Sequence, residues 1–341
     1  MSRQGRSTYP GFTAAIKLVG TGPRGSRDLD FDEARGAMTA LLTGDATGAQ
    51  AGAFLIAMRL KGESPTELAG FARALRDAAL PFPAPGEERP LVACGGAYDG
   101  VASAPHLSIA AAVTAAACGA GVVMHCGTTL GPKRGVTQAD VLAALGGPGR
   151  PSAEESARML SDAGATLVYT PAAVPGWERL AEIRDDIGVR GPLHAAERLL
   201  DFFGARRFVV GYTHSPYPAR ILGALERLGS ERAIAVRGIE GSDVARPARP
   251  TAIGSGGPLQ LPEQLAHRLP AEGGADSSAA ATRAIVAGEL NGAVEQAVAI
   301  SAGLRLYAAG LVEEPGAGAE RGRAALRDGS AASALEAFVG V

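Results

Sequence analysis

Residues 94–146 read CGGAYDGVASAPHLSIAAAVTAAACGAGVVMHCGTTLGPKRGVTQADVLAALG, and this stretch decides the fold. A glycine pair and a Tyr-Asp-Gly turn open it, followed by a small-residue helix and a short apolar strand. The loop after that strand holds His125, Lys133 and Arg134 and leads into a capped helix. A diphosphate requires bare backbone amides, a helix N-terminus and cations around one hollow. The stretch therefore predicts an α/β unit with an anion site at the edge of its sheet.

The same alternation of strand and helix continues beyond this stretch. Such alternation favours a mainly parallel sheet that is covered by helices on both faces. The expected strands are 91–93, 121–124, 166–169, 207–211 and 232–236, and the expected helices between them are 107–118, 137–145, 153–163 and 218–228. The tail predicts a long alanine-rich helix over 277–309 and a last helical stretch over 319–338.

The first 85 residues differ from the rest because they predict helices almost throughout. Ser64-Pro65-Thr66-Glu67 is a strong helix start, with serine as N-cap, proline at the first helical position and glutamate at the third. The proline-rich stretch 81–90 predicts a domain boundary. We expect a small all-helical domain over 1–85, joined by helices from about 172–203, and a larger α/β domain over 86–341.

Composition limits the classes of protein that fit. The chain of 341 residues is 46% hydrophobic and 20% charged, which is typical of a soluble globular protein. Its net charge of −2 argues against a chain that is basic all over, although arginines can still gather on one face. Three cysteines without C-x-x-C spacing favour reduced thiols over a disulfide framework. No membrane span or signal peptide is expected, which predicts a cytoplasmic protein.

The turn after the first strand is the first candidate phosphate site. Glycine lets the backbone approach a phosphate closely, so Gly95, Gly96 and Gly100 are candidate ligands together with Tyr98 and Asp99. A glycine-rich turn without any ligand is an equally good interpretation. Ser108, at the start of the next helix, would suit an anion, but a serine there is more often only a cap.

The loop after the second strand is the next candidate. It would lie at the carboxyl edge, where open α/β sheets bind their ligands. His125, Gly127, Lys133 and Arg134 are its candidates, the last two because cations neutralise diphosphate. The alternative is that the Lys-Arg pair is simply solvated. His214 follows a later strand and so faces the same edge, although a packing or capping role is common for histidine.

Acidic residues follow the strand that ends at Val236. Glu240 and Asp243 lie on a glycine-flanked turn and are candidate ligands for Mg²⁺, which prefers oxygen and shares its ligands with phosphate. Acids in such turns are also ordinary turn formers. We expect the turns 95–100, 125–135 and 238–243 to meet as the rim of one anion pocket.

Taken in order, these segments resemble the anthranilate phosphoribosyltransferase family, glycosyltransferase family 3, nearly from end to end. The resemblance lies in GAFLIAMRLKGESPTELAGFARAL (52–75), HCGTTLGPKRGVTQADVLAALG (125–146) and AIVAGELNGAVEQAVAISAGLRLYAAG (284–310). It implies a helical dimerisation domain beside an α/β domain of the nucleoside phosphorylase/phosphoribosyltransferase-like type. It also implies a homodimer that uses phosphoribosyl diphosphate and Mg²⁺ to attach a ribose to an aromatic amine.

The chain departs from the family at the motifs for the diphosphate and the metal. The family's Gly-Thr-Gly-Gly-Asp is replaced by Cys94-Gly95-Gly96-Ala97, with the acid displaced to Asp99. The lysine of Lys-His-Gly-Asn is lost, and Lys133 is the residue that would reach back. The Asp-Glu metal pair becomes Asp243-Val244, so Glu240 would have to substitute. The arginine that contacts anthranilate corresponds to Arg184.

Three functions follow from this. The first is a phosphoribosyltransferase acting on an aromatic amine or a related acceptor. The second comes from the segments 24–36, 211–217 and 237–249, which resemble a divergent branch that includes DNA-binding proteins without transferase activity. Its phosphate-binding groove would be lined across a dimer by Arg24, Arg27, Lys133, Arg134, Arg246 and Arg249. The third is a protein that senses a phosphorylated metabolite.

Overall fold

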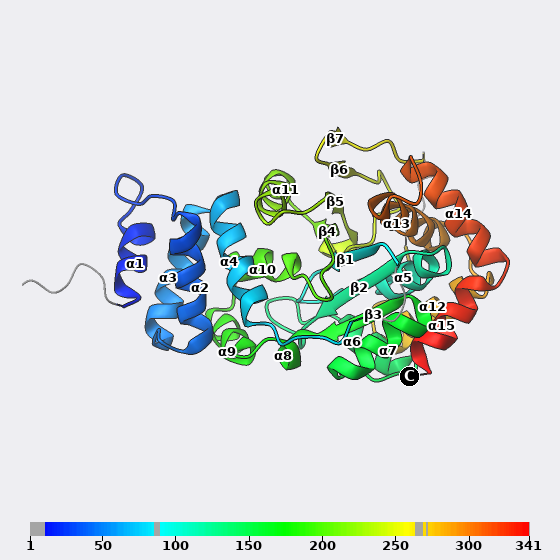
Figure 1. Cartoon of the computed structure of the whole chain (residues 1–341), viewed down its shortest axis with the longest axis horizontal. Coiled ribbons are helices and arrows are strands. Elements are labelled where there is room, and N and C mark those ends of the chain that lie inside the picture. Colours follow the sequence, from blue (N-terminus) through cyan, green and yellow to red (C-terminus); the bar gives the residue numbers. More distant parts are fainter. Residues whose placement is uncertain (1–10, 85–88, 263–268, 271, 341) are drawn as a thin grey trace, which may run out of the picture.

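The computed structural model describes residues 11–84, 89–262, 269–270 and 272–340. Four helices form the amino-terminal part of the chain, at the left of Figure 1. They are α1 (Thr13–Gly20), α2 (Phe31–Thr43), α3 (Gly48–Lys61) and α4 (Pro65–Ala78). The expected boundary near residue 85 lies outside the described residues.

The start of α4 shows why this part is helical. The Ser64 hydroxyl accepts a hydrogen bond from the Glu67 amide (3.3 Å), and the Glu67 carboxylate accepts one from the Ser64 amide (2.8 Å). This capping box confirms the helix start that the sequence predicts. Glu67 is fully buried and also accepts from the Leu29 amide and from Lys61 Nζ, so one side chain joins three segments.

A seven-stranded sheet forms the centre of the second domain, in the order β3-β2-β1-β4-β5-β6-β7. The first five strands in this order are parallel, as the sequence predicts, and the last two add antiparallel pairs that the sequence does not reveal. The strands are β1 (Leu91–Gly95), β2 (Gly121–Cys126), β3 (Ala165–Tyr169), β4 (Arg207–Tyr212), β5 (Arg232–Arg237), β6 (Ala252–Gly254) and β7 (Gly257–Pro258).

Helices cover both faces of this sheet (Figure 1). Alternate residues of a strand point to opposite faces, so Val122 and Met124 join one hydrophobic core and Val123 joins the other. The connecting helices are α5 (Ser108–Ala117), α6 (Gln138–Ala144), α7 (Ala153–Ala163), α8 (Thr170–Ala173), α9 (Trp177–Ile187), α10 (Pro192–Ala196) and α11 (Tyr217–Arg227), with 3₁₀ turns at Glu197–Leu199 and Ile239–Gly241.

The core that contains Val123 continues into the helical domain. Its members include Phe54 and Phe71 of the first four helices and Trp177 and Leu193 of α9 and α10. The segment 172–203 therefore lies between the helical bundle and the sheet, and Figure 1 shows α9 and α10 in that position.

The carboxyl-terminal helices correct one prediction. The single helix expected over 277–309 is two, α12 (Ala275–Val286) and α13 (Ala293–Ala309), because Gly288 and Gly292 adopt left-handed φ values of +72° and +85°. The last stretch likewise divides into α14 (Pro315–Arg327) and α15 (Ser330–Val339) at Gly329 (φ +83°). Alanine favours helix everywhere, so glycine decides where each helix ends.

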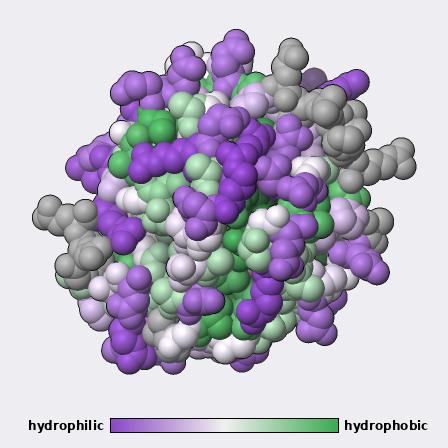
Figure 2. All heavy atoms as spheres, turned by 90° about the vertical axis from the view of Figure 1, so that its right-hand side faces the viewer, coloured by the Kyte–Doolittle hydropathy of each residue, from purple (hydrophilic) through white to green (hydrophobic). Residues whose placement is uncertain are grey.

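Hydrophilic and hydrophobic residues are intermixed on the face of the molecule formed by the carboxyl-terminal helices (Figure 2). Figure 2 shows the end that lies at the right of Figure 1, where hydrophilic side chains cover most of the surface and hydrophobic ones lie in narrower strips between them. Within the described residues no helix is long and apolar enough to cross a bilayer. Cys94, Cys118 and Cys126 are buried and free.

Candidate functional site

The structure brings the three predicted turns together. Gly135 donates its amide to the Asp99 carbonyl (2.8 Å), and a bridge between Val101 and Val136 continues the contact. Lys133 Nζ donates to the Glu240 carbonyl (3.1 Å). Turns 95–100 and 238–243 thus meet residues 131–135 of the predicted 125–135 turn at the carboxyl edge of the sheet, and we call these three segments the rim cluster.

The cations of the rim cluster already have carboxylate partners. Lys133 Nζ lies 3.3 Å from a Glu240 oxygen and 3.9 Å from an Asp99 oxygen. Burial lowers the pKa of Lys133, and these two carboxylates oppose that shift. Arg190 donates from Nε to Asp99 (2.8 Å), so the buried Asp99 carries two cations. Arg134 turns outward, where its exposed guanidinium pairs with Asp185 at 2.6 Å.

Close packing accounts for the glycines of these turns. A Cβ on Gly95 would lie 2.0 Å from the Arg198 carbonyl oxygen, and one on Gly100 (φ +76°) would lie 2.4 Å from Gly135. A Cβ on Gly96 would lie 3.0 Å from Gln138 Nε2, and one on Gly127 would lie 3.2 Å from the Tyr98 ring. The glycines therefore allow the backbone of these turns to pack closely against other residues of the protein.

The side chains of Tyr98, from the 95–100 turn, and of His125, from the end of β2, are buried behind the surface of the rim cluster. The Tyr98 hydroxyl lies 2.6 Å from His125 Nδ1 and 2.8 Å from the Thr170 hydroxyl. His125 is 1% exposed, and burial lowers its pKa to about 3. The imidazole is therefore neutral at pH 7.

The two predicted metal ligands are committed elsewhere. Asp243 is fully buried, accepts the Ser108 hydroxyl on one oxygen and forms an ion pair with Arg305 on the other. Glu240 accepts the amides of Ala102 (3.0 Å) and Ser103 (2.7 Å). The described residues contain no group of three or more His, Cys, Asp or Glu side chains placed to hold a metal.

These carboxylates do not fit a resident Mg²⁺. Burial would raise the pKa of Glu240, but the hydrogen bonds from Ser103 and Ala102 and the charge of Lys133 lower it overall. The Glu240 carboxylate is therefore charged, yet its charge is already neutralised and its oxygens already hydrogen-bonded. Asp243 is already paired with the Arg305 guanidinium, and both side chains are fully buried.

Two buried polar side chains beside the rim cluster have no partner. Both ring nitrogens of His106 and both amide atoms of Gln138 lack a hydrogen bond, although each residue is only 1% exposed. Burial lowers the pKa of His106 to about 4. A buried polar group without a partner indicates a missing ligand or water. Gln138 is not predictable as a site residue, because this residue follows the N-cap Thr137 and has the pattern of an ordinary first-turn residue of a helix.

The predicted acceptor residues lie in two different environments. Arg184 is 4% exposed and is held by Glu197 at 2.7 Å and by His194 Nδ1 at 2.9 Å. Burial raises the pKa of Glu197 to about 7, against the effect of Arg184. Arg198 completes this buried network through His194 Nε2. His214, in contrast, is exposed and lines a cavity.

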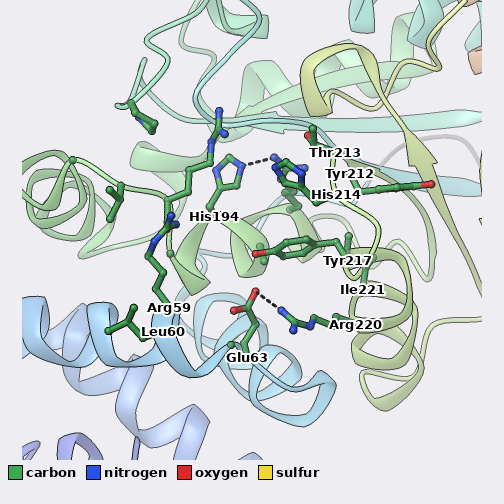
Figure 3. Close-up of a pocket in the computed structure, with 18 residues that line it drawn as sticks. Arg59, Leu60, Glu63, His194, Tyr212, Thr213, His214, Tyr217, Arg220 and Ile221 are labelled. Carbon is green, nitrogen blue, oxygen red and sulfur yellow. Dashed lines mark hydrogen bonds and ion pairs between the residues drawn. The ribbon is translucent and has the colours of Figure 1, made fainter. Parts of the chain in front are cut away.

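This interdomain cavity, of about 670 Å³, lies between the helical bundle and the sheet edge. Figure 3 shows Arg59 and Leu60 on one side, from α3, and Tyr217 and Arg220 on the other, from α11. Pro132 belongs to the rim cluster and also lines the cavity, so the two regions are continuous. Its wall is formed by Arg59, Leu60, Gly62, Glu63, Pro132, Gly188–Gly191, His194, Ala195, Arg198, Tyr212–His214, Tyr217, Arg220 and Ile221.

Most residues of this cavity are not predictable from the sequence. Arg59 and Glu63 end one helix and precede the next, whereas Arg220 lies in a helix more than 150 residues later. Arginine on a helix surface carries no local sign that it faces a hollow, because it is the tertiary fold that joins these segments.

Comparison with known proteins agrees with this architecture. Residues 13–79 match a glycosyl transferase family helical bundle domain, and residues 92–332 match the α/β domain of that family. An anthranilate phosphoribosyltransferase of Thermus thermophilus is 33% identical over 318 residues, covering 91% of this chain and 95% of that one. One from Rubrobacter xylanophilus is 32% identical, covering 92% and 93%.

Solved structures show the same fold. A crystal structure of the anthranilate phosphoribosyltransferase from Thermus thermophilus superposes with a TM-score of 0.84 and 30% identity, covering 96% of this chain and 98% of that one. A Saccharomyces cerevisiae enzyme of the same name, solved with phosphoribosyl diphosphate and Mg, has a TM-score of 0.79 and 18% identity, covering 96% of each chain. The chain therefore belongs to the glycosyl transferase family that joins a helical bundle domain to an α/β domain.

Proposed function

We propose that this protein transfers a phosphoribosyl group from phosphoribosyl diphosphate to the nitrogen of an acidic aromatic acceptor. The observation that carries the proposal is the interdomain cavity, where arginines and tyrosines surround a hollow directly beside the rim cluster. The names of the relatives support the reaction class, and the cavity supports the kind of acceptor.

The cavity wall is suited to an anionic ring. Arg59, Arg190 and Arg220 contribute cations, and Glu63 is its one carboxylate among the described residues. Guanidinium binds carboxylate in bidentate fashion and also stacks on aromatic faces. Leu60 and Val189, at 81% and 37% exposed, give the same cavity an apolar part. About 670 Å³ is within the range of small-molecule sites.

The rim cluster is the place for the diphosphate. Lys133 is held there by Asp99 and Glu240, and the amide of Gln138 and the ring of His106 lack partners beside it. A bound diphosphate would offer Lys133 new oxygens and would supply acceptors to the unpaired donors. Gly95, Gly96, Gly100, Gly127 and Ser108 position these turns around the ligand.

In the reaction, the bond from ribose C1 to diphosphate breaks and a bond from C1 to the acceptor nitrogen forms. Fixed cations at the rim stabilise the charge that develops on the leaving diphosphate. The acceptor nitrogen loses a proton, and Glu63, the carboxylate of the described cavity wall, is the group that we propose receives it. Arg184 does not line the cavity and would instead position His194 of the wall, directly and through Glu197. His214 would contact the acceptor directly.

Two measurements test the proposal. The protein is titrated with phosphoribosyl diphosphate to measure binding, and the release of diphosphate is then measured after an aromatic amine with a carboxylate, such as anthranilate, is added. We expect Arg59→Gln and Arg220→Gln to raise the KM for the acceptor about tenfold or more, since a charge-assisted hydrogen bond contributes about 1.5–3 kcal/mol. Arg227→Gln is the matched control, since it removes the same charge from the same helix as Arg220 but outside the cavity. Equal effects of all three variants would contradict the placement of the acceptor.

The nucleic-acid alternative has less support from the geometry. Arg27 is paired with Glu33, Arg134 with Asp185 and Lys133 with the rim carboxylates. Binding of a single-stranded oligonucleotide that falls steeply with salt, without diphosphate release, would favour it. Stabilisation by phosphoribosyl diphosphate without turnover would instead favour the metabolite-sensing function.

We also propose that the chain acts as a homodimer through its helical domain, on the strength of the family resemblance. Light scattering of the whole chain tests this. A molecular mass of twice 34.4 kDa is expected, and a mass equal to one chain would overturn it.

A further inference from the structure

We propose that Arg305 takes the position of a divalent cation beside Asp243, so that this protein binds phosphoribosyl diphosphate without a metal ion held by its own carboxylates. The inference rests on the proposed function for its ligand. It goes against the use of Mg²⁺ that the resemblance implies.

Both oxygens of Asp243 already have a buried partner. Its Oδ1 accepts the Ser108 hydroxyl, its Oδ2 receives Arg305 Nη2, and both partners are fully buried. A divalent ion at Asp243 would stand next to the guanidinium of Arg305. Repulsion between two cations in a dry site would therefore oppose metal binding.

Arg305 cannot easily move away. Its Nη1 donates to the Ser301 carbonyl (2.8 Å), one turn earlier in α13. The Ser301 hydroxyl in turn accepts the amide of Ala245 (2.9 Å), two residues beyond Asp243. Helix α13 therefore holds the 243–245 turn by two side chains, and the guanidinium is 0% exposed.

The second predicted ligand is equally committed. Glu240 adopts a left-handed backbone (φ +49°) and accepts two amides of the 102–103 segment. A non-glycine residue is held in that conformation only where its surroundings fix it. Val244, where the family has its second carboxylate, is fully buried in the hydrophobic core.

The positive charge that a metal would bring is thus already part of the fold. Arg305 neutralises Asp243, and Lys133 neutralises Glu240 while remaining 15% exposed at the rim. Lys133 and Arg190, which are partly exposed, are then the donors that a diphosphate can reach, and the unpaired Gln138 amide lies buried beside them. A bound diphosphate would therefore contact cationic side chains at the position where the resemblance implies a metal ion.

Two measurements on the whole protein test this. Titration of the metal-free chain with Mn²⁺, followed by electron paramagnetic resonance, should show no stoichiometric site below about 1 mM. Calorimetric titration with phosphoribosyl diphosphate should give affinities in EDTA and in excess Mg²⁺ that agree within about threefold. A stoichiometric Mn²⁺ site that Asp243→Asn removes, or diphosphate binding that disappears in EDTA, would overturn the inference.

Variants of Arg305 separate its charge from its packing. Arg305→Leu frees Asp243 while Glu240 stays committed, so we expect this variant to bind Mn²⁺ more tightly than the wild type does, whereas Arg305→Lys should not. No gain in a folded Arg305→Leu would count against the inference, and if that variant does not fold, the wild-type measurements decide the question alone. Failure of phosphoribosyl diphosphate to bind in either buffer would refute the proposed function, whereas the Mn²⁺ titration would still decide whether Asp243 holds a metal.

Discussion

The rim cluster and the interdomain cavity are built from the same side chains, arginine, lysine and carboxylates, but they use them differently. In the rim cluster, the buried Asp99 is paired with Arg190 and Lys133, and the buried Asp243 is paired with the buried Arg305 of α13. In the cavity, Arg59 is exposed and Arg220 lies 3.9 Å from its carboxylate partner. Charge that is buried must be paired inside the protein, whereas charge that faces a hollow remains available to a ligand.

The largest effect should come from breaking the buried pair at the rim. Arg305→Leu leaves the Asp243 carboxylate unpaired, and loss of one partner of a buried ion pair costs about 3–5 kcal/mol. Arg305→Leu combined with Asp243→Asn should recover most of that loss, because no charge is left unpaired. Urea unfolding of the four proteins measures the cycle, and a double variant no more stable than Arg305→Leu would contradict the pairing.

The free energy of unfolding should depend on pH through His125, which is buried behind the rim. Burial lowers the pKa of His125 to about 3, below the ordinary value of 6.5, so the unfolded chain binds a proton between these values and the folded chain does not. The stability that depends on His125 is therefore complete above pH 6.5 and is lost as the pH falls toward 3. At pH 5 the loss is about 2 kcal/mol relative to pH 7.

A variant that does not titrate isolates this effect. His125→Gln retains an acceptor for the Tyr98 hydroxyl, so its stability deficit relative to the wild type should shrink by about 2 kcal/mol between pH 7 and pH 5. The pKa of Glu197, which burial raises to about 7, has an opposite effect that is common to both proteins and cancels in the difference. A deficit that is the same at both pH values would show that His125 is protonated in the folded state.

The two neighbouring cations of the 131–135 loop sharpen the comparison further. Lys133 points into the rim cluster and Arg134 points outward to Asp185, so Lys133→Ala should weaken binding of phosphoribosyl diphosphate by at least about 1 kcal/mol. Arg134→Ala removes the same charge one residue later and should leave the affinity unchanged. Calorimetric titration of the two variants with phosphoribosyl diphosphate measures this difference. Equal losses of affinity would show that the directions in which Lys133 and Arg134 point do not decide binding.

The smallest effect on stability should come from the cavity. Arg220→Gln breaks a long, partly exposed ion pair with Glu63, and such pairs contribute about 0–1 kcal/mol. The unfolding free energy of this variant should therefore stay within about 1 kcal/mol of the wild type, although its acceptor KM rises. A large loss of stability would mean that Arg220 is structural, like the charges of the rim.

The amino-acid sequence determined the elements and much of their order. Alternating apolar strands, the Ser64–Glu67 capping box and the glycine-rich turns act over a few residues, so local pattern was sufficient for five parallel strands, the helical amino-terminal domain and the turns of the rim. It did not show that Gly288, Gly292 and Gly329 would divide the tail into separate helices.

Tertiary structure alone decided how the charges are used. Asp243 and Arg305 are 62 residues apart, and Arg59 and Arg220 belong to different domains, so no local pattern relates them. The free energy of a charge depends on its burial and on its partners rather than on its neighbours in the sequence. For that reason the predicted metal ligands proved to be internal ion-pair partners, and the cavity between the domains emerged only when the chain was folded.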